Sequence, residues 1–206
     1  QLRKMHLARD NAAAFTLDKM HAMVDRDERQ IQSLIRLIED MLDVSRIRTG
    51  KLSIRPGRFD LAQLVHNLVE NFAPQVAAAQ SSMQLVAEGP VEGNWDEFRI
   101  EQVVTNLLTN ALRYGAKSPV LVRVYREQDQ ARVEVRDRGI GISEENQKRI
   151  FQQFERVSAS QVAAGLGLGL FISEQIVAAH GGTIEVESRI GEGALFRVCL
   201  PLEPSA

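Results

Sequence analysis

A long stripe of apolar side chains between residues 16 and 48 is the feature that most limits how this 206-residue chain can fold. Its members recur at the three- and four-residue steps of one helix face: Leu17, Met20, Val24, Ile31, Leu34, Ile35, Ile38, Met41 and Leu42. The charged run Asp25 to Arg29 interrupts it. A helix of about nine turns with so narrow an apolar face is not buried by itself, so the pattern predicts a partner helix in a coiled coil or bundle.

The residues around this helix predict a partial helical hairpin followed by a separate domain. Residues 1–9 have the pattern of the tail of an earlier helix, and the alanine-rich residues 10–15 would form the connecting turn. Thr49 and Gly50 end the long helix, and Pro56 with Gly57 punctuates a short basic connector. We therefore expect a helical hairpin that dimerises into a bundle over residues 1–50, a linker over 51–59 and a larger domain over 60–206.

The larger domain is expected to combine helices with a β-sheet. Asp60 is placed to cap a helix that carries apolar residues as far as Val76, and further helices are predicted near residues 96–114, 144–153 and 168–180. Alternating apolar residues predict strands near 120–124, 133–135, 184–186 and 195–200. Because alternation gives a sheet one covered and one wetter face, the sequence predicts an α+β fold, a two-layer α/β sandwich with helices on one face of a mixed sheet.

Composition excludes several classes of function. A net charge of −2 gives no electrostatic reason to expect nucleic acid or an anionic membrane as a partner. A lone cysteine, Cys199, allows no internal disulfide, which fits a reducing compartment. No run of about 18 apolar residues is present. We therefore expect a cytoplasmic location without membrane contact by these residues, although they could form the cytoplasmic part of a membrane-anchored receptor.

Two glycine-rich segments stand where a strand or loop leads into a helix. The first is Asp137-Arg-Gly-Ile-Gly141, and the second is Gly165-Leu-Gly-Leu-Gly169. The second is not a Walker loop, since no Gly-Lys-Ser/Thr follows, and not a dinucleotide fingerprint, since Leu170 replaces the last glycine. Glycines serve turns more often than ligands. Two such segments together nevertheless favour phosphate binding, because backbone N–H groups at the start of a helix hold anions.

A polar stripe on the predicted helix 96–114 is the third feature with chemical content. Asn106, Asn110 and Arg113 stand at positions i, i+4 and i+7, so two amides and a guanidinium share one helix face. An amide oxygen there could bind Mg²⁺, a hard cation that prefers oxygen ligands, while Arg113 offsets phosphate charge. The alternative is a pair of surface or sheet-capping amides, because asparagine is mostly exposed in proteins.

Taken together, these segments resemble the sequence boxes of bacterial sensor histidine kinases, in the order of that family. Asn106-Leu-Leu-Thr-Asn-Ala resembles the N box, and the segments starting at Asp137 and Gly165 resemble the two glycine boxes. Phe151-Gln-Gln-Phe-Glu-Arg-Val resembles the F box. Asp40-Met-Leu-Asp-Val-Ser-Arg and Thr49-Gly-Lys-Leu are similar to the end of the second helix of the dimerisation and phosphotransfer domain. The resemblance covers nearly the whole chain.

The resemblance implies an ATP-binding sandwich of the GHKL type, shared with gyrase, the Hsp90 chaperone and mismatch-repair ATPases, with ATP and Mg²⁺ as ligands. Asp137 would accept the adenine amino hydrogen, with Tyr114, Gly139, Gly141 and Ile142 around the base. Asn110, helped by Asn106, would bind Mg²⁺, and Arg113 would lie near the phosphates. A lid over residues 155–165 would fold onto the phosphates through the second glycine box, which consists of Gly165, Leu166, Gly167, Leu168 and Gly169.

The resemblance also implies partners and a phosphorelay. The relatives form homodimers through the N-terminal helices and dock a response-regulator receiver domain, for which the acidic stretch Asp25 to Glu28 is a candidate contact. Phe151, Phe154, Trp95 and Cys199 are expected as packing residues, although the two phenylalanines also anchor the lid hinge in the family.

Two departures from the family pattern stand out. Arg138 occupies the place of the usual asparagine in the first glycine box, and we expect a small effect because Asp137 and both glycines remain. The box around the phosphoacceptor histidine is absent: His6 and His21 are not followed by Glu-Leu-Arg, and His66 and His180 fall within the ATP-binding part. We therefore expect the acceptor to lie upstream of residue 1, so that the chain binds ATP without phosphorylating itself.

Two other functions fit parts of the sequence. The first is a catalytically inactive histidine-kinase-like module that signals or dimerises without using ATP, and the presence of Asn110 and Asp137 argues against it. The second is another ATPase of the same fold, such as an anti-sigma-factor serine kinase or a chaperone. The long helix that ends in Asp-Val-Ser-Arg46 favours the histidine kinase.

Overall fold

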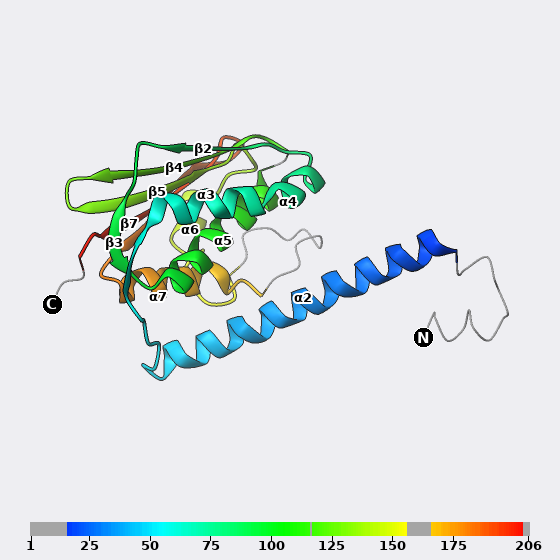
Figure 1. The fold of residues 1–206 in the computed structure, drawn as a ribbon, viewed down its shortest axis with the longest axis horizontal. Helices are drawn as coiled ribbons and strands as arrows, with labels where there is room; N and C mark the ends of the chain where they lie inside the picture. The colour runs from blue at the N-terminus through cyan, green and yellow to red at the C-terminus, as the bar shows by residue number, and fades with distance from the viewer. Residues whose placement is uncertain (1–15, 116, 156–165, 204–206) are drawn as a thin grey trace. The chain divides into compact units, whose positions relative to one another are not determined.

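The structure is a computed structural model that describes residues 16–115, 117–155 and 166–203. The chain divides into two compact units, residues 1–42 and residues 43–206. The predicted long helix is confirmed as α2, Leu17–Arg48, whose last six residues belong to the second unit (Figure 1). The expected hairpin partner and turn, over residues 1–15, fall outside the described residues, and the division at residues 51–59 stays a prediction.

The apolar stripe of α2 faces solvent in the single chain. All nine of its apolar side chains are more than two-fifths exposed, from 43% at Ile35 to 73% at Leu17. Exposed apolar side chains at helical spacing are the face that a coiled coil or bundle buries. No helix among the described residues is long and apolar enough to cross a bilayer.

A mixed five-stranded sheet forms the centre of the second unit. Its strands lie in the order β2-β4-β5-β7-β6, with bounds Met83–Ala87, Val120–Glu127, Gln130–Arg136, Gly193–Pro201 and Thr183–Arg189. β2 pairs in parallel with β4, and the other pairs are antiparallel. A separate two-stranded sheet joins β1, Gly57–Asp60, to β3, Glu92–Trp95. The four strands predicted from alternation are therefore confirmed.

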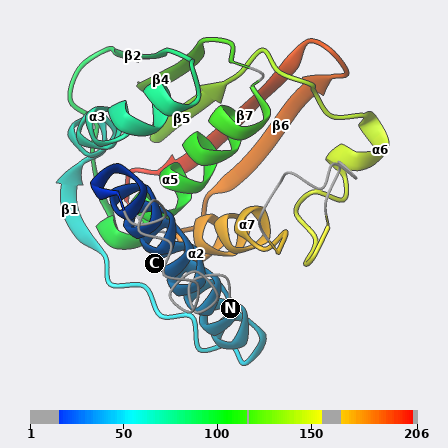
Figure 2. The same cartoon turned by 90° about the vertical axis from the view of Figure 1, so that its right-hand side faces the viewer.

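The principal helices of this unit cover one face of the sheet, as Figure 2 shows. They are α3, Leu61–Asn71, α5, Glu97–Tyr114, and α7, Gly169–Ala179. The core between the two layers takes alternate residues from the strands, such as Val122, Val133 and Val198, which are at most 2% exposed. The predicted two-layer α/β sandwich with a mixed sheet is thus confirmed.

Two predicted helices are shorter than the sequence pattern indicated. Asp60 caps α3 as predicted, by accepting the N–H of Ala62 at 2.9 Å, but the helix ends before Phe72 and a separate short helix follows, α4, Ala73–Ala78. Pro74 explains the break, because proline suits a first helical turn and disrupts an interior one. The helix predicted over 144–153 is only α6, Glu144–Gln147, and turns replace its second half.

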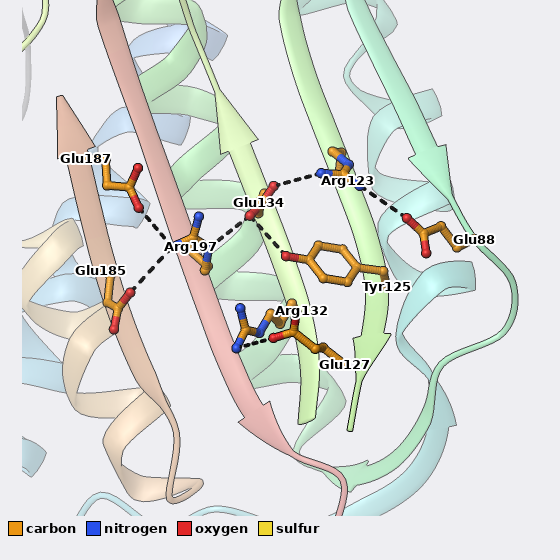
Figure 3. Close-up of polar contacts among 9 residues, drawn as sticks. All are labelled: Glu88, Arg123, Tyr125, Glu127, Arg132, Glu134, Glu185, Glu187 and Arg197. Atoms are coloured by element: carbon orange, nitrogen blue, oxygen red, sulfur yellow. Dashed lines mark hydrogen bonds and ion pairs between the residues drawn. The ribbon is translucent and has the colours of Figure 1, made fainter. Parts of the chain in front are cut away.

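The open face of the sheet carries a row of alternating charges instead of a second layer of helices (Figure 3). Arg123, Glu134, Arg197 and Glu185 stand opposite one another on four neighbouring strands. Glu134 lies 2.9 Å from Arg197 and 3.5 Å from Arg123, and it accepts the hydroxyl of Tyr125 at 3.1 Å. Burial alone would raise the pKa of Glu134, but the bonds from Arg197 and Tyr125 and the two cationic charges outweigh it and hold that pKa below its ordinary value.

The end of α2 is anchored inside the second unit by a buried ion pair. Asp43 is 4% exposed, and its carboxylate accepts Arg99 at 2.8 Å and Gln102 at 2.8 Å, both from the first turns of α5. Val44, the next residue, belongs to the hydrophobic core. The end of α2 from Asp43 onward and the start of α5 therefore form one packed junction.

Candidate functional site

Helix α5 is the element that brings the predicted site residues together. Asp96 caps its start by accepting the N–H of Arg99 at 3.1 Å. Its buried face, including Val103 and Leu107, fixes the rotation of the helix against the core. The polar stripe is thereby presented along one side, with Asn106 and Asn110 half-buried, Arg113 exposed and Tyr114 half-buried at the C-terminal end.

The C-terminal end of α5 contacts the first glycine segment. The N–H of Ile140 donates to the carbonyl oxygen of Tyr114 at 3.2 Å. A Cβ at Gly139 would overlap that same carbonyl oxygen, so only glycine permits the approach. The loop after β5 is therefore held directly against the helix that carries the two asparagines.

Asp137 is the buried acid of this loop. It is 6% exposed, and its Oδ1 accepts the N–H of Gly139 at 2.8 Å. Burial raises the pKa of Asp137 above its ordinary value, although the backbone N–H groups of Gly139 and Ala194 oppose the shift. A carboxylate has about four lone-pair sites, so two backbone donors leave acceptor capacity for a ligand amino group.

The other side of the loop rests on the turn between β6 and β7. Gly141 has φ +70°, and a Cβ there would overlap the carbonyl oxygen of Arg189. Gly191 donates its N–H to Ile140 at 2.8 Å, and Ile142 donates its N–H to the hydroxyl of Ser188 at 2.8 Å. These contacts fix the path of the backbone that follows Asp137, a preorganised arrangement for a ligand.

The second glycine segment meets the middle of α5. A Cβ at Gly169, the first residue of α7, would overlap Oδ1 of Asn106. Gly167 has φ +70°, and its carbonyl oxygen accepts the N–H of Phe154 at 3.1 Å. Leu168 is buried at 2% exposure and Leu166 is 36% exposed. Gly165 and the predicted lid beyond Glu155 lie outside the described residues.

Several residues have surroundings that the sequence did not predict. Phe154 is 62% exposed at φ +64°, so its assignment to the core was wrong, whereas Phe151 packs against the core. The reason is local, because the left-handed turn at Phe154 directs its side chain away from the core-facing side of the segment. Trp95 and Cys199 are buried, as predicted.

His180 is a buried side chain that connects the end of α7 to the start of α5. It is 3% exposed, and its Nε2 accepts the backbone N–H of Asp96 at 3.0 Å. This leaves Nδ1 to carry the proton and donate to the carbonyl oxygen of Ile176 at 2.7 Å. Gly181 and Gly182 follow His180 directly, and nothing in this local sequence indicates that its side chain is buried.

Comparison with known proteins identifies the class. Residues 95–204 match the family described as histidine kinase-, DNA gyrase B-, and HSP90-like ATPases, so the chain belongs to that family. Within the family its relatives are sensor histidine kinases. It is 35% identical over 178 residues to the circadian input-output histidine kinase CikA of Synechococcus elongatus, and 33% identical over 173 residues to the sensor histidine kinase RcsC of Escherichia coli.

These relatives are much longer proteins. The matched part is 82% of this chain in both cases but only 23% of CikA and 18% of RcsC. Among solved structures, the histidine kinase AdeS of Acinetobacter baumannii matches the fold with a TM-score of 0.73 over 97% of this chain and 92% of that chain, at 23% identity. Full-length ShkA in complex with AMPPNP matches with a TM-score of 0.77 at 25% identity, over 93% of this chain and 40% of that chain.

Proposed function

We propose that this chain is the ATP-binding catalytic region of a sensor histidine kinase, which transfers the γ-phosphoryl group of ATP to a histidine for relay to a response-regulator aspartate. The observation that carries the proposal is the position of α5 between the two glycine segments. Its end contacts Gly139 and Ile140, and its middle contacts Gly169. A nucleotide laid along α5 would therefore reach a buried acid at one end and the start of α7 at the other.

Each end suits a different part of ATP. The buried carboxylate of Asp137 would accept the adenine amino group, with Ile142 and Tyr114 beside the ring. The N-terminus of α7, with Gly167 and Gly169, would face the phosphates, because helix N-termini favour anions. Arg113 would add positive charge from α5. Positioning and charge stabilisation supply most of the catalysis in phosphoryl transfer, and this arrangement of residues fits that demand.

The donor set also fits Mg²⁺. No cluster of three or more His, Cys, Asp or Glu side chains that could hold a metal is found in the described parts of the chain. Mg²⁺ does not need such a cage at nucleotide sites, because it keeps several waters and is held by one or two protein oxygens together with the phosphates. The amide oxygens of Asn110 and Asn106 would provide these ligands. When bound, Mg²⁺ neutralises charge that develops on the phosphate oxygens.

The phosphoacceptor is proposed to be a histidine outside these 206 residues. His180 uses both ring nitrogens in buried hydrogen bonds, so neither is available as a nucleophile. His66 lies on α3, with Glu70 at 3.4 Å, and His21 lies exposed on α2 without the expected neighbours in sequence. His6 is outside the described residues.

The test uses γ-labelled ATP on this chain and on a longer form of the protein. We expect the chain to bind Mg·ATP yet remain unlabelled, and the longer form to acquire acid-labile, alkali-stable phosphate that it passes to a receiver domain. Labelling of the 206-residue chain on its own histidines would contradict the placement of the acceptor. Acid-stable label would indicate a serine kinase, and absence of nucleotide binding by the folded chain would favour an inactive signalling module.

We also propose that the chain forms a homodimer through α2. The exposed apolar stripe of that helix is the surface that supports this assignment. Sedimentation equilibrium should show a dimer, and replacing Ile35 and Ile38 with aspartate together should yield monomers, because two charges would enter the apolar seam. The double variant Arg36→Asp with Glu39→Asp, at positions next to these but off the apolar stripe, serves as the control. A parent that sediments as a monomer at high micromolar concentration would refute the proposal.

A response-regulator receiver domain remains the proposed second partner, and the cytoplasm the proposed location. The acidic stretch at Asp25 to Glu28, on α2, is the proposed contact for the receiver. Charge reversal there should slow phosphate transfer to the receiver in the labelling experiment without changing nucleotide binding.

A further inference from the structure

Gln147, the last residue of α6, bridges two backbone carbonyl groups at the end of the first glycine segment. Its Nε2 donates to the carbonyl oxygen of Ile142 at 3.0 Å and to the carbonyl oxygen of Ser188 at 2.8 Å. Ile142 directly follows Gly141, and Ser188 lies on β6, an edge strand of the five-stranded sheet. One amide group therefore ties the end of the glycine segment to the sheet.

The chemistry of the two partners fixes the orientation of this amide. A backbone carbonyl oxygen can only accept a hydrogen bond, and the NH₂ group of glutamine carries two hydrogens, one for each carbonyl. A flipped amide would lose both bonds and would set Oε1 of Gln147 against the two carbonyl oxygens. Gln147 therefore acts as a double donor in this position.

A second tie holds the other polar group of the Ile142 backbone. The N–H of Ile142 donates to the hydroxyl oxygen of Ser188 at 2.8 Å, and that hydroxyl donates in turn to the carbonyl oxygen of Gly193. Both roles are fixed, because an N–H only donates and a carbonyl only accepts. A Cβ at Gly193 would overlap the carbonyl oxygen of Asp137, so the same turn lies against the backbone of the buried acid.

We propose that Gln147 is a positioning residue for adenine binding, which ties Ile142 to β6 and so holds the loop after Asp137 in the conformation that receives the base. The inference rests on the proposed function, which places Asp137 and Ile142 beside adenine. A loop that is held before the ligand arrives loses less conformational freedom on binding, and the affinity is higher for that reason. Gln147 acts through Ile142 and needs no contact with the nucleotide.

Removal of both donors should weaken nucleotide binding about tenfold. When the binding-competent conformation is only partly populated, the affinity falls by that fraction. Two neutral hydrogen bonds are enough to change such a population by about tenfold, even though the bond from Ile142 to Ser188 remains. We expect Gln147→Met, which keeps the length of the side chain, to weaken Mg·ATP and Mg·ADP equally, because the two nucleotides share the adenine. Titration calorimetry measures both affinities.

Two further variants separate the donors from the shape of the side chain. Gln147→Glu keeps the shape but sets carboxylate oxygens against the two carbonyl oxygens, so it should weaken binding at least as much as Gln147→Met. A side chain that only filled space would tolerate both changes. Asn146→Asp makes the same change from amide to carboxylate one residue earlier on α6, and it should bind as the parent does. Circular dichroism melting establishes that each variant is folded.

Hydrogen exchange at the backbone N–H of Ile142 is a second readout. In the parent without nucleotide this N–H should exchange slowly, because it is bonded to Ser188 and the loop is held. In Gln147→Met it should exchange faster without nucleotide and return to the parent's rate with saturating Mg·ADP, since the bound base then holds the loop. A general defect in folding would persist with the nucleotide bound.

The outcomes distinguish the inference from the function on which it rests. If the folded parent binds neither nucleotide, the proposed function fails and the inference falls with it. If the parent binds both and the two Gln147 variants bind as tightly, the positioning role alone is overturned. A loss confined to Mg·ATP, or fast exchange at Ile142 that persists with saturating Mg·ADP, would overturn it as well.

Discussion

Replacing Asp137 with asparagine should weaken Mg·ATP binding roughly 100-fold. The substitution removes an acceptor from a buried position and puts an NH₂ group where the adenine amino group must donate. A hydrogen bond to a charged group is worth about 1.5–3 kcal/mol, and each 1.4 kcal/mol corresponds to about a tenfold change in affinity. Two donors, the asparagine NH₂ and the adenine amino group, would then face each other without an acceptor. The desolvation penalty of that arrangement places the expected loss of affinity at the upper end of this range. Titration calorimetry measures it directly.

The fold should survive this substitution. The side-chain oxygen of asparagine can still accept the N–H of Gly139, which now bonds to Oδ1 of Asp137 at 2.8 Å. Because burial raises the pKa of Asp137, its charge is a cost to folding near neutral pH, and the neutral amide removes that cost. Glu144→Gln, an equal change of charge on exposed α6, should leave binding as in the parent. Unaltered affinity in Asp137→Asn would remove Asp137 from the adenine site.

Replacing Asp43 with alanine should lower the free energy of unfolding by about 3 kcal/mol. Asp43 and Arg99 have side chains only 6% and 9% exposed, with 2.8 Å between Oδ2 and the guanidinium. Removing one partner of a buried pair leaves the other charge without compensation, which costs about 3–5 kcal/mol. Gln102, which still bonds Arg99 at 2.9 Å, places the expected loss at the lower end of that range. Urea unfolding monitored by circular dichroism gives the value.

Two controls identify the source of that loss. Arg46 also lies near Asp43, at 3.4 Å, but its side chain is 54% exposed, so Arg46→Ala should cost under about 0.5 kcal/mol. The double variant Asp43→Leu with Arg99→Met replaces both charges by apolar groups and should recover most of the stability. Equal losses in Asp43→Ala and Arg46→Ala would show that the burial of the pair contributes nothing.

The sequence predicted elements well where pattern and capping agreed. The start of α3 was predicted because an acidic cap at Asp60 precedes a continuous apolar face. The strands β1 and β3 were missed because each has only four residues, and β3 contains glycine and asparagine, which strands usually lack. The helix predicted through Val76 failed because Pro74 starts a new helix, a local signal that the apolar spacing concealed.

The sequence motifs identified the residues of the candidate site but not the side chains that contact them. The glycine segments and the asparagine stripe identified which residues to consider, and their family order gave each a role. The partner of Asn106 lies far away in sequence, since Ser173 is 67 residues from it, and outside the site Arg99 is likewise 56 residues from Asp43. Serine and arginine are common on helices, so nothing in the local pattern marks either as buried and paired. Such pairings follow from the topology of the sheet and the helices above it.

The charge row on the open face of the sheet has a consequence for how the strands find their alignment. A slip of one residue is penalised by the apolar face, but a slip of two keeps every side chain on its own side. On β5, the residues two positions from Glu134 are Arg132 and Arg136. Either slip would set an arginine opposite Arg123 on β4 and Arg197 on β7, in place of the carboxylate that pairs with both. A slip of β5 by two residues is therefore disfavoured by charge repulsion, and a slip by one residue is disfavoured because it exposes the apolar face.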